Sequence, residues 1–123
     1  MLGDEVSTDP ILVVDDNPDT RDALRRVLQI RGHPVVTARD GRDALAYLRG
    51  GGPASLIVLD LYMPGIDGRL FRAAQLSDPE LARIPVIVFS VAVGETLPDV
   101  VGFVRKNDPL ALLSHIDQVL QAA

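Results

Sequence analysis

The chain has 123 residues, 47% of them hydrophobic, and a formal net charge of −5 at pH 7. This length and composition predict a single domain with its own core. The chain contains no cysteine, which excludes disulfides, thiolate metal sites and cysteine catalysis.

Charge and hydropathy also limit the surroundings of the protein. An acidic chain argues against direct nucleic-acid binding, which requires a basic surface. No apolar run approaches the roughly 20 residues of a membrane span. Residues 1–10 lack the basic region and apolar core of a signal peptide. We therefore expect a cytoplasmic protein with no membrane insertion.

The first apolar run is followed by a helical pattern. Residues 11–14 (ILVV) are typical of a strand buried on both faces. Pro18 suits the first turn of a helix, and Asn17 is its expected N-cap. Inward-facing residues at helical spacing follow, namely Leu24, Val27 and Leu28, and Gly32 is expected to end the helix.

The same alternation continues to the end of the chain. Further strands are expected at residues 34–38, 55–60, 85–90 and 102–106, and further helices at residues 41–49, about 67–76 and about 109–121. The inward residues expected on the second and last helices are Ala44, Leu45 and Leu48, and Leu112, Leu113, Ile116, Val119 and Leu120. This order predicts an α/β fold, with a doubly wound parallel sheet of five strands and helices on both faces.

The segment between the last two strands is an exception to this pattern. Gly94 and Pro98 disfavour a regular helix over residues 91–101. We expect one or two helical turns at most, so that a fourth helix is short or missing. Residues 1–10 are expected to be an N-terminal extension, and residues 11–123 the domain itself.

Polar residues stand where four of the five strands end. They are Asp15, Asp16, Asp60, Ser90 and Lys106, the last being the only lysine in the chain. The carboxyl ends of parallel strands meet at one edge of the sheet, so we expect one shared pocket. Three carboxylates repel one another unless a cation joins them, and Mg²⁺ prefers oxygen ligands. A lysine opposite would pair with a phosphate oxygen, which points to a phosphoryl group carried on a carboxylate.

Four stretches of the chain resemble the receiver domain of two-component response regulators. They are ILVVDDNPDTRDALRRVL, LIVLDLYMPGIDG, PVIVFS and GFVRK, and the resemblance covers residues 11 to about 120. It implies a flavodoxin-like fold and a signalling switch rather than a turnover enzyme. The implied partners are a histidine kinase or phosphotransfer protein and a downstream protein or effector domain.

The same resemblance assigns roles to individual residues. Asp60 would be the phosphoacceptor. Asp16 would bind Mg²⁺ directly, Asp15 mainly through water, and the backbone carbonyl of Tyr62 would complete the protein's share of the ligands. The remaining roles would be a switch hydroxyl, a phosphate-pairing lysine and a switch aromatic, carried by Ser90, Lys106 and Phe103.

Three features depart from the family pattern. Asn107 follows Lys106, where the family usually has a proline and often a cis bond, so this loop is either trans and rearranged or cis and strained. Val91 replaces a very small residue beside the pocket and could narrow access to it. The spacing from Ser90 to Lys106 is also shorter than usual, which concerns the output surface and not the acidic pocket.

Other functions fit the sequence less well. The altered loop allows a receiver-like interaction module that is not regulated by phosphorylation. A flavodoxin-like mononucleotide binder would need a Ser/Thr/Gly-rich phosphate loop where this chain has Asp15, Asp16, Asn17 and Pro18. An aspartyl phosphohydrolase would need a second aspartate at the position of Tyr62.

Overall fold

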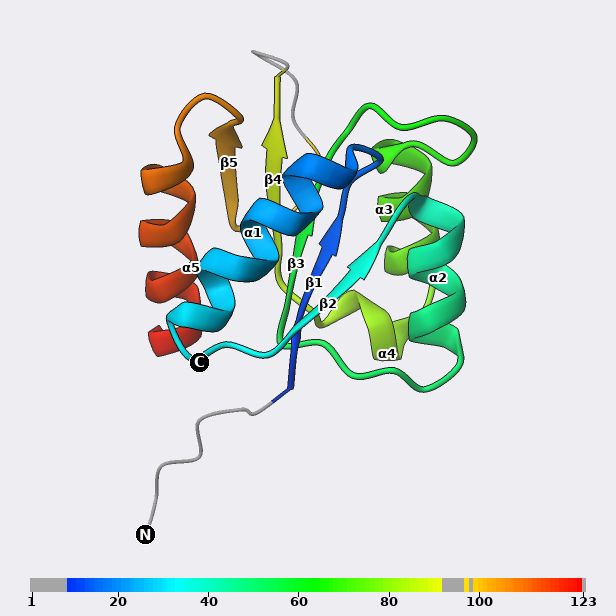
Figure 1. The fold of residues 1–123 in the computed structure, drawn as a ribbon. Coiled ribbons are helices and arrows are strands. Elements are labelled where there is room, and N and C mark those ends of the chain that lie inside the picture. The colour runs from blue at the N-terminus through cyan, green and yellow to red at the C-terminus, as the bar shows by residue number, and fades with distance from the viewer. Residues whose placement is uncertain (1–8, 92–96, 98, 123) are drawn as a thin grey trace, which may run out of the picture.

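Five parallel strands form a single sheet. The computed structural model describes residues 9–91, 97 and 99–122. The strands are β1 (Ile11–Val14), β2 (Val35–Ala38), β3 (Leu56–Leu59), β4 (Val86–Ser90) and β5 (Gly102–Arg105). They pair in the order β2-β1-β3-β4-β5 (Figure 1). Because β1 lies between β2 and β3, the chain reverses its direction of winding at β1, which is where such sheets form their sites.

The helices cover both faces of the sheet. They are α1 (Pro18–Ile30), α2 (Gly41–Arg49), α3 (Gly68–Leu76), α4 (Pro79–Ala82) and α5 (Pro109–Ala122). Side chains of α1 and α5 pack on one face, and those of α2, α3 and α4 pack on the other. The predicted doubly wound α/β fold is therefore confirmed. None of the described helices is long and apolar enough to cross a membrane.

Aspartate and asparagine side chains cap the first turns of the helices. The Asn17 side chain accepts two backbone N–H groups at the start of α1, as the sequence predicts, and Asp67 does the same for α3. The one-turn helix α4 was not predicted, although Asp78 caps it and Pro79 begins it. One inward-facing assignment is wrong, because Val27 is 38% exposed on α1 and belongs to neither core cluster.

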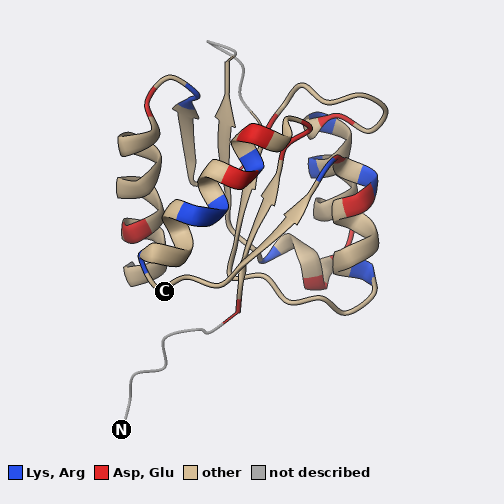
Figure 2. Cartoon of the chain, in the orientation of Figure 1, with Lys and Arg blue, Asp and Glu red and all other residues tan. Residues whose placement is uncertain are grey.

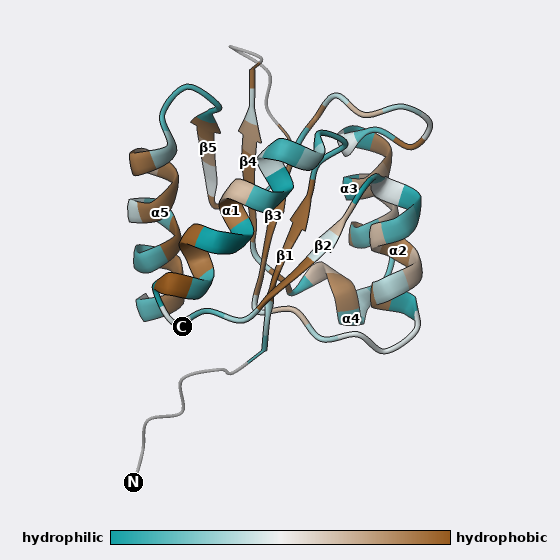
Figure 3. Cartoon of the chain, viewed as in Figure 1, coloured by the Kyte–Doolittle hydropathy of each residue, from teal (hydrophilic) through white to brown (hydrophobic). Residues whose placement is uncertain are grey.

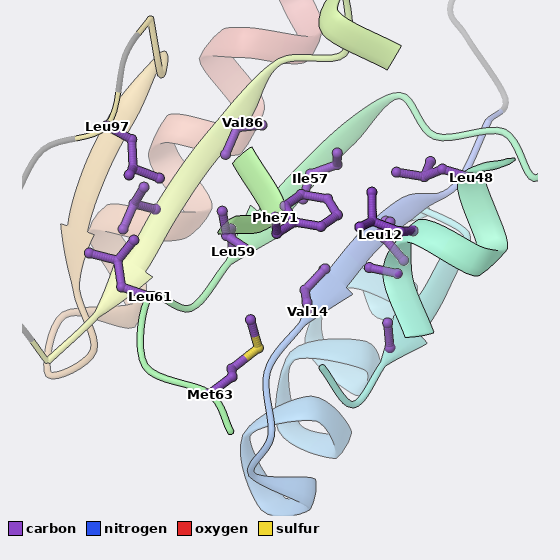
Figure 4. Packing of buried hydrophobic residues seen from close by; sticks show 14 of the residues in the cluster. Leu12, Val14, Leu48, Ile57, Leu59, Leu61, Met63, Phe71, Val86 and Leu97 are labelled. Carbon is purple, nitrogen blue, oxygen red and sulfur yellow. The ribbon is translucent and has the colours of Figure 1, made fainter. Parts of the chain in front are cut away.

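Alternate strand residues build two separate cores. Ile57 and Leu59 of β3 pack in the cluster with α2, α3 and α4, whereas Leu56 and Val58 pack in the cluster with α1 and α5. Figure 3 shows the strands brown along most of their length, while the helices alternate between brown and teal. Figure 4 shows the ring of Phe71 from α3 among the side chains of the first cluster.

The connection between β4 and β5 is only partly described. Residues 92–96 and 98 lie outside the described residues, and with them most of the segment for which a short helix was expected. Leu97 is buried in the core, and Val100 packs against it. Residues 97 and 99–101 lie in no helix.

Candidate functional site

Two buried aspartates lie side by side where β1 and β3 end. Val14 of β1 is in register with Leu59 of β3, so Asp15 and Asp60 are the next residues on neighbouring strands. The Asp60 N–H donates to the Val14 carbonyl at 3.0 Å, which continues the ladder to this point. Although both are acidic, their exposed fractions are only 2% and 3%.

A third aspartate completes the cluster from the loop before α1. Asp16 is exposed, so its carboxylate faces solvent at the mouth of the site. Asp15, Asp16 and Asp60 each offer an oxygen, and these oxygens all lie within 4.8 Å of one another. In Figure 2, acidic residues are visible where the carboxyl ends of the strands lie.

The only lysine of the chain bridges the two buried carboxylates. Lys106 Nζ lies 2.8 Å from an Asp15 oxygen and 3.3 Å from an Asp60 oxygen. Its backbone is fixed at the end of β5, because the Lys106 N–H donates to the Ser90 carbonyl at 3.0 Å. The structure therefore brings Lys106 together with Asp15 and Asp60 at one edge of the sheet.

One lysine does not balance three carboxylates. Burial, followed by the charge of Asp15, raises the pKa of Asp60, although Lys106 and the Tyr62 N–H act in the opposite direction. Burial alone would lower the pKa of Lys106, but its hydrogen bond to Asp15 and the charges of both aspartates raise it. The site thus keeps a charged lysine and carries excess negative charge.

Backbone N–H groups also orient the carboxylates. The Asn17 N–H donates to Asp15 Oδ1 at 2.9 Å, and the Tyr62 N–H lies 3.3 Å from Asp60 Oδ1. The Arg21 guanidinium donates to the backbone carbonyl of Asp15 at 2.8 Å. The sequence analysis did not identify Arg21. A contact from the first turns of a helix back to the end of the preceding strand has no distinct sequence motif.

The two expected switch residues stand near this edge in different settings. Ser90 is fully buried at the end of β4, in register with Arg105. Phe103 is half-buried on β5 and packs against the core cluster that contains Phe71. Tyr62 is 45% exposed, and the Arg69 guanidinium carbon lies 5.9 Å from the centre of its ring.

The structure also answers two questions raised by the departures from the family pattern. None of the described peptide bonds is cis, so the Lys106–Asn107 bond is trans. Val91 is 69% exposed. Its side chain faces solvent, and this exposure does not support the expected narrowing of the pocket.

The cluster has the chemistry of a hard-cation site. Its donors are carboxylate oxygens, which suit Mg²⁺ or Ca²⁺ better than the softer transition metals. Two of the carboxylates are buried with one compensating lysine, so a divalent cation would relieve their repulsion. The exposed Asp16 leaves room for the waters that Mg²⁺ usually keeps.

Comparisons with known proteins agree with this architecture. The family model described as response regulator receiver domain matches residues 11–107. Protein PilH of Pseudomonas aeruginosa is 35% identical over 86 residues, which are 70% of either chain. The chain spans half or less of the length of several other curated regulators that it matches.

Solved structures show the same fold. A response regulator receiver protein from Pseudomonas putida is 31% identical, with a TM-score of 0.79 over 92% of this chain and 99% of that one. The response regulator TrrA of Thermotoga maritima, solved in complex with Mg(2+)-BeF, is 27% identical, with a TM-score of 0.78 over 91% of this chain and 98% of that one. With the family model covering the sheet and the acidic cluster, the chain belongs to the response regulator receiver domains, which are signalling switches and not turnover enzymes.

Proposed function

We propose that this receiver domain is a phosphoacceptor switch, and that Asp60 is the residue phosphorylated. The observation that carries the proposal is the setting of the Asp60 carboxylate. It is buried, lies 3.3 Å from Lys106 Nζ, and has two further carboxylates within 4.8 Å. This arrangement suits a carboxylate that accepts a phosphoryl group while neighbouring charges hold the phosphoryl oxygens.

The phosphoryl donor would be a phosphohistidine of a histidine kinase or phosphotransfer protein. An Asp60 oxygen would bond to phosphorus while the phosphorus–nitrogen bond to the imidazole breaks, and the imidazole would leave with the electron pair. Lys106 would pair with a phosphoryl oxygen, as a compact charge does. The hydroxyl of Ser90 would donate to the same group, and Phe103 would carry the change to the surface.

Mg²⁺ is the cofactor that we propose for this site. Asp15, Asp16 and Asp60 would hold it, together with the backbone carbonyl of Tyr62. When bound, it would neutralise the negative charge shared by the carboxylates and the phosphoryl oxygens. The Mg(2+)-BeF complex of the related TrrA supports this choice of metal.

The output would be a change in protein–protein contacts. The proposed recipient is a downstream partner or an effector domain, and the proposed location is the cytoplasm. We propose that the domain extends over residues 11–123, beyond the 11–107 covered by the family model, because α5 contributes Leu112 and Ile116 to the core.

Intact-mass measurement with a small acyl phosphate and Mg²⁺ tests the phosphoacceptor assignment. The wild-type chain should gain one phosphoryl group, and Asp60→Asn should gain none. Asp67→Asn is the matched control, because Asp67 lies on the same loop but caps α3, and asparagine caps equally well. Phosphorylation that persists in Asp60→Asn, or is lost in Asp67→Asn, would contradict the assignment.

A second candidate is an interaction module that phosphorylation does not regulate. The observation in its favour is that residues 97 and 99–101, the described part of the connection between β4 and β5, lie in no helix. NMR spectra with and without Mg²⁺ and beryllofluoride distinguish the two candidates. Shifts that extend from Asp60 to β5 and α5 support the switch, whereas shifts confined to the pocket support the unregulated module.

A further inference from the structure

The buried face of α3 contains two polar side chains, which is unusual for an amphipathic helix. Its buried side chains include Phe71, but also Arg72 and Gln75, with exposed fractions of 3% and 0% for the last two. Taking a guanidinium or an amide out of water costs free energy unless its hydrogen bonds are replaced. The partners of these two residues therefore show what the helix face does.

Arg72 links α3 to the connection between β4 and β5. One guanidinium nitrogen donates to Gln75 Oε1 at 2.8 Å, and the other donates to the backbone carbonyl of Asp99 at 3.1 Å. Gln75 in turn donates to the carbonyls of Leu81 and Ile84, at 2.9 and 3.1 Å. A planar guanidinium held at two acceptors fixes both position and direction.

Asp99 is held in a conformation that needs support. Its φ of 55° is in the left-handed region, which costs a non-glycine residue free energy, although aspartate tolerates it better than most. Burial lowers the pKa of Arg72, and the charge of Asp99 opposes that shift. Both the backbone carbonyl and the charge of Asp99 therefore interact favourably with the arginine.

The chain on either side of Asp99 leads to structural anchors. Leu97 is buried, and in Figure 4 it lies at one end of the apolar cluster. The Val101 N–H donates to the Val86 carbonyl at 2.9 Å, directly before β5 begins. A residue that fixes Asp99 thus fixes the entry of the chain into β5.

We propose that Arg72 is a latch, meaning a buried side chain that holds Asp99, shortly before β5, against α3. The latch connects α3, the helix after the loop that follows Asp60, to β5. This strand contains Phe103 and leads to Lys106. The Gly68 N–H at the start of α3 donates to the Leu61 carbonyl at 2.9 Å, so the link begins at the residue after Asp60. The latch does not depend on phosphorylation of Asp60, so a failure of either proposal leaves the other standing.

Amide hydrogen exchange of Arg72→Met in the full chain tests the latch. Methionine keeps the apolar stem but removes the guanidinium and its N–H donors. The Val101 N–H should exchange at least about tenfold faster, because a lost hydrogen bond to a charged group promotes local opening. The Ile57 N–H donates to the Pro85 carbonyl at 2.9 Å, on the opposite side of β4, and should stay within about twofold of wild type.

Two comparisons make the result decisive. Arg83→Met removes an exposed arginine from the turn after α4 and should change neither amide. If Arg72→Met does not fold, Arg72→Lys keeps the charge but replaces two guanidinium nitrogens in a fixed plane by one ammonium nitrogen. The Val101 N–H should then again be accelerated more than the Ile57 N–H. Unchanged exchange at Val101, or equal acceleration at Val101 and Ile57, would overturn the latch.

Discussion

Replacing Asp60 by asparagine should stabilise the metal-free protein at neutral pH. The carboxylate of Asp60 is repelled by Asp15, whose oxygen lies within 4.8 Å, at about 3.5 kcal/mol for an effective dielectric constant near 20. Lys106 at 3.3 Å attracts it by about 5 kcal/mol on the same basis. The exposed Asp16 adds about 1 kcal/mol of repulsion in a water-like dielectric.

These charge interactions almost cancel, so the cost of burial decides the sign. A charge with 3% exposure loses most of its hydration, whereas an amide of the same shape loses much less. The raised pKa of Asp60 also indicates that the folded protein disfavours the charged carboxylate. Its largest cause is burial, and the next is the charge of Asp15. We expect Asp60→Asn to raise the free energy of unfolding by about 1–2 kcal/mol.

The dependence on pH gives the prediction a second, independent readout. Because the pKa of Asp60 is raised in the folded protein, the folded state binds the proton more tightly than the unfolded state does. Wild-type stability therefore falls as pH rises from the ordinary carboxyl value of 3.8 through the raised pKa of Asp60. The advantage of Asp60→Asn should be full above that window and should vanish below it.

Urea unfolding in the presence of a chelator measures both effects. Asp67→Asn serves as the control and should match wild type within a few tenths of a kcal/mol, since asparagine and aspartate cap helices equally well. Saturating Mg²⁺ should reduce the difference between Asp60→Asn and wild type. An asparagine variant that is less stable than wild type without metal, or a difference that does not change with pH, would refute the reasoning.

Three further predictions concern the residues around the same pocket. Lys106→Met should destabilise the protein by about 3 kcal/mol at neutral pH, because it leaves Asp15 and Asp60 buried without a cation. Adding Asp60→Asn should restore part of the lost stability. Thermal unfolding of the single and double variants measures both effects. Mg²⁺ should raise the unfolding midpoint of the wild-type protein, and Asp16→Ala should remove most of that increase; an equal increase in both would contradict metal binding at this cluster. Asn17→Ala should cost about 1 kcal/mol through the lost helix cap while Asn17→Asp costs little, and equal urea midpoints for the two variants would contradict the assigned cap.

The sheet and the acidic cluster were predictable because their signals are local. Residues 56–59, for example, are apolar throughout, and such a continuous run is typical of a strand that is covered on both faces. Asn17 and Asp67 act through the residues that immediately follow them, so their caps are readable from sequence. The convergence of Asp15 and Asp60 follows from parallel pairing alone.

Long-range contacts were not predictable in the same way. Arg72 and Gln75 break the apolar pattern of α3, and their partners lie on segments that no periodicity connects to them. Val27 follows the helical spacing but lies beyond the edge of the buried stripe, so spacing alone placed it wrongly. The helix α4 has a cap and a proline but is too short for any stripe.

The alternation of β3 between two cores has a consequence for insertions and deletions. Leu56 and Val58 serve one core and Ile57 and Leu59 the other, and Asp60 follows in the same alternation. Removing one residue from β3 would exchange the two sets and carry the aspartate to the opposite side of the sheet. Removing two would keep the sides but shorten the strand by roughly 7 Å, which would draw the aspartate away from Asp15. Length changes in this lineage should therefore accumulate in the loops at the amino ends of the strands, such as residues 50–55, and be absent from the strands themselves.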